Sequence, residues 1–194
     1  MQVERLDIPG VFQITPARFG DPRGYFSVTH NQQALADAGM DLRFCQDNQS
    51  WSAAAGTVRG LHFQSPPASQ AKLVRAVTGS ILDVVVDARV GSPTYGQHLK
   101  RRLDSATGAQ LLVPHGCLHG FVTLEADTIV FYKVDAYYAP ALEDSISWND
   151  PDLGIDWGVS PGEVSLSDKD ANAMAWSDFV SPFVYEPQPG ESAQ

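Results

Sequence analysis

Residues 56–75 combine the residue types needed for proton transfer and for anion binding. This stretch contains His62, whose imidazole can lose and regain a proton near neutral pH and is therefore a candidate general base. The cations Arg59, Lys72 and Arg75 lie close to this histidine in the sequence and could hold an anionic ligand. The stretch therefore predicts an acid–base site that accepts a negatively charged molecule.

The element that carries His62 is predicted to be a β-strand over residues 57–64. A strict two-residue alternation would place His62 on one face of this strand and Arg59 on the other. A glycine inside a strand often marks a bend or a close approach of two backbones, and Gly60 lies between the two residues. We therefore expect a bend near Gly60 if Arg59 and His62 serve the same ligand.

Short apolar segments separated by turn residues recur along the chain. Residues 72–77 and 81–86 flank the turn at 78–80 and are expected to form a hairpin, and the valines at 84–86 are predicted to be buried. Helical signals are short. One helix is expected over residues 31–39, with Asn31 as its N-cap and Gly39 as its stop, and a helix start is expected at Ser167, before residues 171–176. The pattern predicts a mainly β protein, a cupin-like jelly-roll barrel with a few short helices.

Length and composition indicate an ordinary globular protein without a linker or an internal repeat. The chain has 194 residues, of which 43% are hydrophobic and 19% charged. We predict a single jelly-roll domain over residues 1–185 and a disordered tail over residues 186–194, which are rich in proline, glycine and serine.

The balance of charge limits the partners that we expect. The formal net charge is −10, and a strongly acidic surface repels nucleic acids and anionic lipids. No apolar segment is long enough to cross a bilayer, residues 1–5 lack the layout of a secretion signal, and two cysteines are too few for a disulfide framework. We therefore expect a cytoplasmic protein with no nucleic-acid partner and no membrane association.

Histidines in a β-barrel raise the alternative of a metal site of the cupin type. Such a site uses about three histidine or carboxylate ligands, often in a His-x-His pattern. No His-x-His occurs in this sequence, His62 and His119 each stand alone, and the other three histidines lie in unrelated contexts. We predict no metal and no cofactor, and we interpret Cys117 as a buried structural thiol.

Two further residues could complete an acid–base site. Tyr132 lies in a predicted strand between Val130 and Val134 on the same face, where its phenol could donate a proton or simply be a core hydroxyl. Asp170 could orient a histidine, or it could belong to a helix cap that begins at Ser167. The residues alone leave both alternatives open.

A series of spaced motifs then resembles one known family. The matching residues are Arg59-Gly60-Leu61-His62-Phe63-Gln64, Pro67, Gln70, Lys72-Leu73-Val74, Gly79, Asp83, Val86-Asp87, Arg89, Ser92-Pro93-Thr94, Pro114, Gly116, His119-Gly120-Phe121, Tyr132-Lys133, Tyr137-Tyr138-Ala139-Pro140, Glu143, Trp148-Asn149-Asp150-Pro151 and Leu166-Ser167-Asp168-Lys169-Asp170. In order and spacing they are similar to the dTDP-4-dehydrorhamnose 3,5-epimerase family over roughly residues 5–180.

The resemblance implies a cupin-like jelly roll without a metal, a homodimer, and proton transfers beside a 4-keto group. It makes His62 the base and Asp170 its carboxylate partner. It makes Lys72 the group that stabilises the enolate oxygen and Tyr132 the acid on the opposite face of the sugar. Inversion needs two such groups, because a proton leaves one face of the carbon and another arrives on the other.

By the same resemblance, further side chains contact a nucleotide-diphosphate sugar. They are Arg23, Phe26, Gln46, Asn48, Arg59, His119, Tyr138, Glu143 and Lys169. Arg23 is expected to reach over from a partner chain, Arg59 to face the diphosphate, and Tyr138 to stack on the base. Arg23, Arg59 and Lys169 would then form a basic cluster in an otherwise acidic protein.

One position departs from the pattern of the family, which commonly has Phe-x-Glu after the Arg-Gly turn near residue 23. Here Phe26 is followed at the glutamate position by Val28, which leaves the acid–base set intact and bears on the choice of nucleotide base.

The function that we predict is epimerisation at C3 and C5 of a nucleotide-linked 4-keto-6-deoxyhexose, from dTDP-4-keto-6-deoxy-D-glucose to dTDP-4-keto-L-rhamnose, through an enolate. One alternative is an epimerase that inverts only one of these carbons for an unusual deoxysugar. A second is a metal-dependent cupin oxygenase or isomerase. A third is a sugar-binding cupin without catalysis, which the intact acid–base set disfavours.

Overall fold

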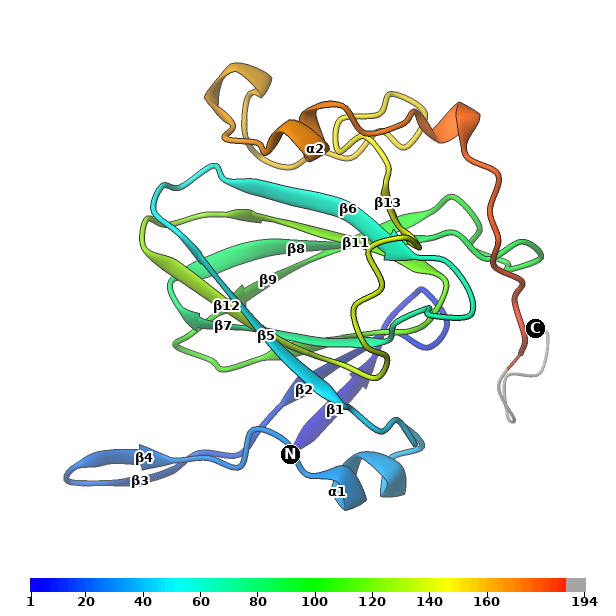
Figure 1. Ribbon diagram of the computed structural model, residues 1–194. Coiled ribbons are helices and arrows are strands. Elements are labelled where there is room, and N and C mark those ends of the chain that lie inside the picture. Colours follow the sequence, from blue (N-terminus) through cyan, green and yellow to red (C-terminus); the bar gives the residue numbers. More distant parts are fainter. Residues whose placement is uncertain (188–194) are drawn as a thin grey trace.

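The computed structural model describes residues 1–187 and consists mainly of two antiparallel β-sheets that face each other (Figure 1). In spatial order, the six-stranded sheet comprises β1 (Gln2–Arg5), β2 (Phe12–Thr15), β10 (Gln110–Val113), β7 (Lys72–Thr78), β12 (Thr128–Val134) and β5 (Gln46–Ser52). The five-stranded sheet comprises β13 (Glu143–Ser145), β6 (Val58–Gln64), β11 (Cys117–Thr123), β8 (Ser80–Asp87) and β9 (His98–Asp104). The mainly β, jelly-roll prediction is confirmed.

The sheets pack face to face because their strands alternate apolar side chains between two buried layers. Between the sheets lies a core to which β8 contributes Ile81 and Val85 and β12 contributes Val130. A second core, with Val84 and Val86, covers the other face of the five-stranded sheet. Both faces of β8 are therefore buried, which explains why apolar residues occupy both faces of this strand and confirms the predicted burial of the three valines.

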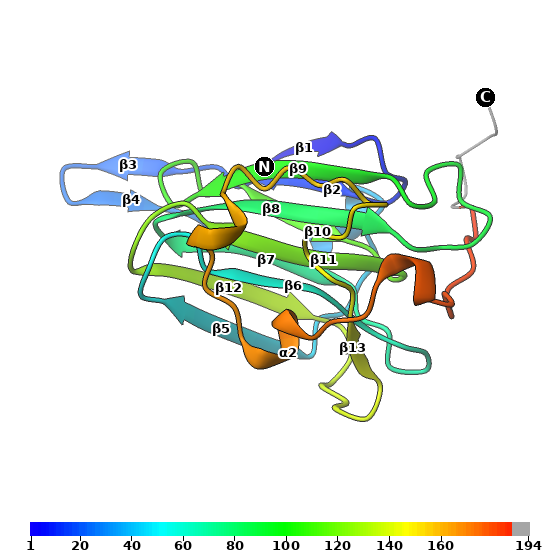
Figure 2. The same cartoon turned by 90° about the horizontal axis from the view of Figure 1, so that it is seen from above.

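The C-terminal segment forms the layer above the five-stranded sheet (Figures 1 and 2). It includes three short helical turns, η1 (Pro161–Glu163), α2 (Asp168–Ala171) and η2 (Trp176–Asp178). The helix start at Ser167 is confirmed, since its side chain accepts a hydrogen bond from Asp170 N–H. The helix ends at Ala171 and does not continue to Trp176, because the chain beyond it becomes extended and Met174 forms a β-bridge with Ile146.

The first helix, α1 (Gln32–Asp37), packs on the outer face of the six-stranded sheet. Its N-cap is Asn31, as predicted, and Leu35 enters a third apolar cluster with Ile14 and Leu73. Gly39 follows with φ of +85°, the conformation that ends many helices.

The predicted hairpin at residues 78–80 is wrong. β7 pairs with β10 and β12, whereas β8 pairs with β11 and β9, so the turn carries the chain from one sheet to the other. At Gly79, with φ of +70°, a Cβ atom would lie 2.3 Å from Thr128 Oγ1. A glycine between two strands indicates a tight reversal, but it does not distinguish a hairpin from a corner between sheets.

The strands β3 (Phe19–Asp21) and β4 (Gly24–Phe26) form a small hairpin that projects away from the sandwich (Figure 1). Phe19, Tyr25 and Phe26 on this hairpin are 64%, 58% and 67% exposed. The predicted tail at 186–194 lies almost entirely outside the described residues, and the single domain over residues 1–185 stays a prediction.

Candidate active site

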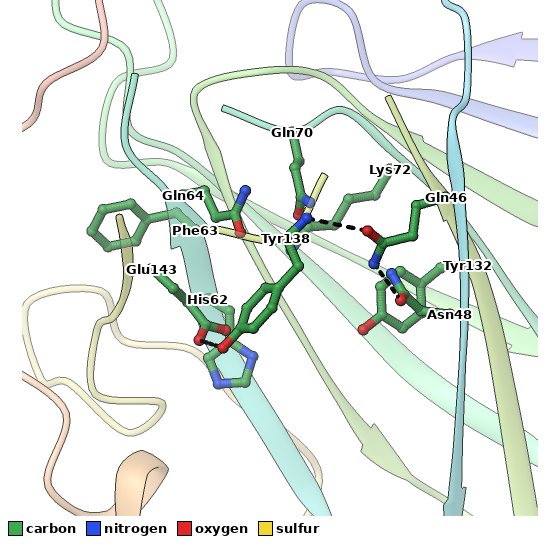
Figure 3. Close-up of a pocket in the computed structure, with 10 residues that line it drawn as sticks. All are labelled: Gln46, Asn48, His62, Phe63, Gln64, Gln70, Lys72, Tyr132, Tyr138 and Glu143. Carbon is green, nitrogen blue, oxygen red and sulfur yellow. Dashed lines mark hydrogen bonds between the residues drawn. The ribbon is translucent and has the colours of Figure 1, made fainter. Parts of the chain in front are cut away.

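A pocket opens between the edges of the two sheets and gathers much of the predicted site (Figure 3). Its lining consists of Gln46, Asn48, His62, Phe63, Gln64, Gln70, Lys72, Tyr132, Tyr138 and Glu143. His62 comes from the five-stranded sheet, whereas Lys72 and Tyr132 come from the six-stranded sheet. A ligand in this pocket therefore has the imidazole and the phenol on opposite walls.

A β-bulge in β6 places His62 and Arg59 on the same face. On the neighbouring strand β11, His119 pairs with His62 and Phe121 pairs with Arg59. The two pairs are therefore three residues apart on β6 but only two residues apart on β11. The extra residue confirms the expected bend near Gly60, and it corrects the strict alternation that had separated Arg59 from His62. A Cβ atom on Gly60, at φ of +125°, would lie 2.5 Å from Gly120 Cα, so the close approach of the two strands at this point requires a glycine.

His62 and Asp170 form a pair, although 108 positions separate them. His62 Nε2 lies 2.5 Å from Asp170 Oδ1, and the carboxylate is almost completely buried. Burial on its own raises the pKa of Asp170, but hydrogen bonds from His62, Ser167 and the backbone of Gly60 outweigh it and lower the pKa overall. The carboxylate is thus ionised and fixes the orientation of the imidazole, and it also serves in the helix cap, so both sequence interpretations of Asp170 hold.

Lys72 provides a buried cation in the pocket. Its side chain is buried, and among residues 1–187 its ammonium group has neither a hydrogen bond nor an ion pair within contact distance. Burial lowers the pKa of Lys72 to about 8, while the charges of Glu143 and Asp83 act in the opposite direction. A cation in such a place attracts a developing negative charge on a ligand.

Tyr132 faces the pocket from β12, with Val130 and Val134 on the same side of the strand, as predicted. Burial raises the pKa of its phenol, and the charge of Glu143 adds to this effect while Arg59 opposes it. The phenol therefore keeps its proton at neutral pH and can act as a donor.

A hydrogen-bonded chain lies at the mouth of the pocket. The Tyr138 hydroxyl donates to Glu143 Oε2 at 2.8 Å, and Lys169 Nζ lies 2.7 Å from the same oxygen. Burial raises the pKa of Glu143, but its bonds to Lys169 and Tyr138 outweigh burial and lower the pKa. Lys169 and Glu143 are thus brought together as a pair beside the pocket.

Several predicted contacts lie outside this pocket. Arg23 is on the projecting hairpin, where its guanidinium pairs with Asp21 at 2.6 Å, and Phe26 lies on the same hairpin. The basic cluster of Arg23, Arg59 and Lys169 therefore does not form within one chain. Arg75 is also directed elsewhere, since it stacks over the Phe131 ring at 5.3 Å.

His119 lies beside His62 on β11 but is absent from the lining of the pocket. It is buried and lies 2.6 Å from Asp83 Oδ1, a partner that sequence reasoning did not assign to the site. The sequence did contain a signal for this pair: Asp83 lies between Leu82 and Val84 in an apolar strand, and a buried carboxylate needs a hydrogen-bond or charge partner. Gln64 and Gln70, quoted only as part of a motif, were likewise missed as pocket residues.

No group of three or more histidine, cysteine, aspartate or glutamate side chains within residues 1–187 is arranged to hold a metal ion. Cys117 is buried as predicted, and burial raises the pKa of its thiol to about 12. No helix in the described part of the chain is long and apolar enough to cross a membrane.

The fold and the pocket define a class of protein, the cupin-like sandwiches that carry acid–base groups between their two sheets. Comparison with known proteins narrows this class. The profile of dTDP-4-dehydrorhamnose 3,5-epimerase matches residues 5–178. The dTDP-4-dehydrorhamnose 3,5-epimerase of Sinorhizobium fredii is 45% identical over 185 residues, which cover 95% of this chain and 94% of the relative.

A solved structure of an epimerase resembles this chain over almost its whole length. The dTDP-6-deoxy-D-glucose-3,5-epimerase of Legionella pneumophila, in complex with dTDP-4-keto-L-rhamnose, is 37% identical with a TM-score of 0.91, covering 96% of this chain and 99% of that one.

A dTDP-4-dehydrorhamnose 3-epimerase of Streptomyces niveus is also similar in sequence. It is 40% identical over 176 residues, which cover 90% of this chain and 84% of the relative. The chain belongs to the dTDP-4-dehydrorhamnose 3,5-epimerase family.

Proposed function

We propose that the protein inverts C3 and C5 of dTDP-4-keto-6-deoxy-D-glucose and forms dTDP-4-keto-L-rhamnose. The observation that carries this proposal is the arrangement of the pocket, in which His62 and Tyr132 lie on opposite sheets and the unpaired Lys72 lines the same pocket. The S. fredii relative, which bears the name of this double inversion, favours it over single inversion.

The proposed reaction uses the residues as follows. The free ring nitrogen of His62 takes the proton from the carbon next to the ketone, and Asp170 stabilises the imidazolium that results. The electron pair of the broken C–H bond moves to the carbonyl oxygen, where Lys72 stabilises the enolate. The enolate collapses and takes a proton from Tyr132 on the other face, which inverts the carbon. The phenolate then regains a proton from solvent and the imidazolium of His62 releases one to solvent.

We also propose a cytoplasmic homodimer in which each site is completed by the partner's hairpin. The exposed aromatic residues of β3 and β4 support this, because a projecting apolar arm is typical of an association surface. Such an arm could bring Arg23 and Phe26 to the partner's pocket, where Arg59 and Tyr138 would bind the diphosphate and the base. The roles of Gln46, Asn48, His119, Glu143 and Lys169 as substrate contacts belong to the same proposal.

Isotope exchange tests the reaction. In heavy water with dTDP-4-keto-6-deoxyglucose, we expect deuterium at both C3 and C5, measured by NMR. We expect His62→Ala to abolish exchange, whereas Tyr132→Phe should still remove a proton but fail to invert the carbon. Absence of exchange at both carbons would refute the epimerase, and label at one carbon alone would favour the single-site alternative.

Two further measurements address the remaining alternatives. Stoichiometric iron or zinc in the purified active protein would favour a metal-dependent cupin. Exchange with UDP-, GDP- and CDP-linked sugars, compared with the dTDP sugar, would reveal whether Val28 alters the choice of base.

A further inference from the structure

The connection between β12 and β13, residues 135–142, crosses from one sheet to the other beside the pocket and carries Tyr138. It has no helix or strand of its own, so its backbone groups need hydrogen-bond partners from elsewhere. Three glutamine side chains supply several of them. Figure 3 shows these glutamines around Tyr138 and marks the bond between Gln46 and Tyr138.

Gln64 makes the largest number of these contacts. Its Oε1 accepts from the backbone N–H of Ala139 at 2.8 Å, and its Nε2 donates to the carbonyl of Tyr137 at 3.3 Å. The same Nε2 also donates to the carbonyl of Ala68 at 2.7 Å. The backbone is thus held on both sides of Tyr138 by one amide, which is only 5% exposed.

Gln46 and Gln70 hold the connection at two more points. The backbone N–H of Tyr138 donates to Gln46 Oε1 at 3.1 Å, and Gln70 Nε2 donates to the carbonyl of Ala136 at 2.8 Å. Gln46 lies on the edge strand β5 of the six-stranded sheet, whereas Gln64 lies on β6 of the other sheet. The connection is therefore tied to both sheets at once.

We propose that Gln64 is a positioning residue for substrate binding, because it fixes residues 137–139 so that Tyr138 stays beside the pocket. Gln64 follows His62 by two positions on β6 and shares its face, so one strand carries the base and holds the connection. An amide is needed here, since it presents an acceptor to one backbone group and donors to two others. This inference rests on the proposed function only for the identity of the ligand, a dTDP sugar.

Two substitutions at Gln64 separate its donor and acceptor roles. Gln64→Glu keeps the shape and the acceptor for Ala139 N–H but places oxygen against the carbonyls of Tyr137 and Ala68. Gln64→Leu has similar bulk and loses all three bonds. The matched control is Gln110→Glu, because Gln110 is 3% exposed, donates to the carbonyl of Thr29 at 2.7 Å and lies outside the pocket.

Binding and kinetics give the first readout. We expect Gln64→Glu to weaken dTDP binding in calorimetry and to raise KM by about tenfold, with kcat changed less than about threefold, because the reacting groups are untouched. Gln110→Glu should lower the melting temperature without changing KM. An equal fall of kcat and kcat/KM in Gln64→Glu, with KM unchanged, would overturn the proposal.

A double mutant isolates the route of the effect. If Gln64 acts through Tyr138, Gln64→Glu should change dTDP affinity by less than about twofold once Tyr138→Ala is present. Fully additive effects of the two substitutions would contradict the proposal.

Hydrogen exchange followed by mass spectrometry gives a readout that does not depend on activity. Amides of residues 136–142 should exchange at least about tenfold faster in both Gln64 variants, and at the wild-type rate in Gln110→Glu. Unchanged exchange would refute the positioning role, even in a protein that fails to bind dTDP. Conversely, a wild-type protein without epimerase activity would refute the proposed function. The hydrogen-exchange measurement would then still test whether Gln64 fixes the connection.

Discussion

At the scale of single residues, Lys72 is a buried cation whose charge has two consequences. Burial lowers the pKa of Lys72 to about 8, so a rise of pH through this value removes the positive charge that would face an enolate. In the unfolded chain the same group titrates at its ordinary value of 10.5. Catalysis and stability should therefore respond to pH in opposite directions.

We predict that kcat/KM falls as pH rises through about 8, by close to tenfold per pH unit above it, in a pH–rate profile. Lys72→Met should abolish most activity at every pH. The control Lys100→Met, on β9, removes a lysine that bonds to Asp156 away from the pocket and should keep the wild-type profile. A wild-type profile that stays flat to pH 10 would argue against Lys72 as the enolate partner.

The stability prediction follows from proton counts. Between pH 8 and 10.5 the unfolded state binds more protons at Lys72 than the folded state, so the free energy of unfolding from this group rises with pH across that window. Below it, the folded state carries the whole cost of the buried charge. Lys72→Met should therefore be more stable at pH 7, on the order of 2 kcal/mol in denaturant titrations, with no such rise. A less stable variant would contradict this prediction.

Residue types alone identified part of the site. An imidazole at position 62 and a phenol at position 132 were readable as acid–base candidates, since few side chains transfer protons near neutral pH. The pairing of His62 with Asp170 came only from the family resemblance, because 108 intervening positions leave no local signal. Gln64 was missed for a different reason: a neutral amide in a strand says nothing about which backbone it will hold.

At the scale of elements, the bulge in β6 decides which side chains reach the pocket. Gly60 is its centre, where the backbone approaches Gly120 and donates to Asp170. Any Cβ atom at this position would need β6 and β11 to separate.

We predict that Gly60→Ala destabilises the protein by roughly 3 kcal/mol and reduces deuterium exchange into the sugar, because both the strand pairing and the orientation of Asp170 change. Thermal and denaturant unfolding together with the exchange assay measure the two effects. Gly158→Ala is the matched control, since Gly158 also has positive φ but no atom lies within 4 Å of its Cβ position. It should cost only about 1 kcal/mol and keep full exchange. Equal losses in both variants would rule out the close approach as the cause.

The elements were predictable to the extent that local patterns determine them. The strands, the helix after Asn31 and the bend at Gly60 followed from alternation, capping and glycine placement. The face of Arg59 and the turn at residues 78–80 did not, because both depend on which strands pair. That choice is made by the tertiary packing of the two sheets, which a short window of sequence does not contain.

At the scale of the whole molecule, the projecting hairpin suggests that one chain does not contain a complete site. Arg23 lies in the turn between β3 and β4 and is not among the residues that line the pocket of its own chain. If the partner supplies it, two defective chains can complement each other.

We predict that His62→Asn and Arg23→Ala proteins, each nearly inactive, regain about a quarter of wild-type activity when mixed in equal amounts and allowed to exchange subunits. Half of the dimers are then mixed, and one of the two sites in each is intact. The activity is measured by the same NMR assay before and after exchange. Two His62-defective proteins, such as His62→Asn with His62→Ala, serve as the control and should stay inactive. No recovery in the first mixture would place Arg23 in its own chain's site or outside any site.

The position of Asp170 in the C-terminal layer also has a consequence for the order in which the protein becomes competent. Every strand of both sheets ends by Ser145, so a chain growing from its N-terminus can complete its pocket while Asp170 has still to be synthesised. Until the last layer docks on β6, the imidazole lacks the carboxylate that orients it. The base is thus oriented by the part of the chain that is synthesised last, and we expect a protein that ends before Asp170 to lose turnover.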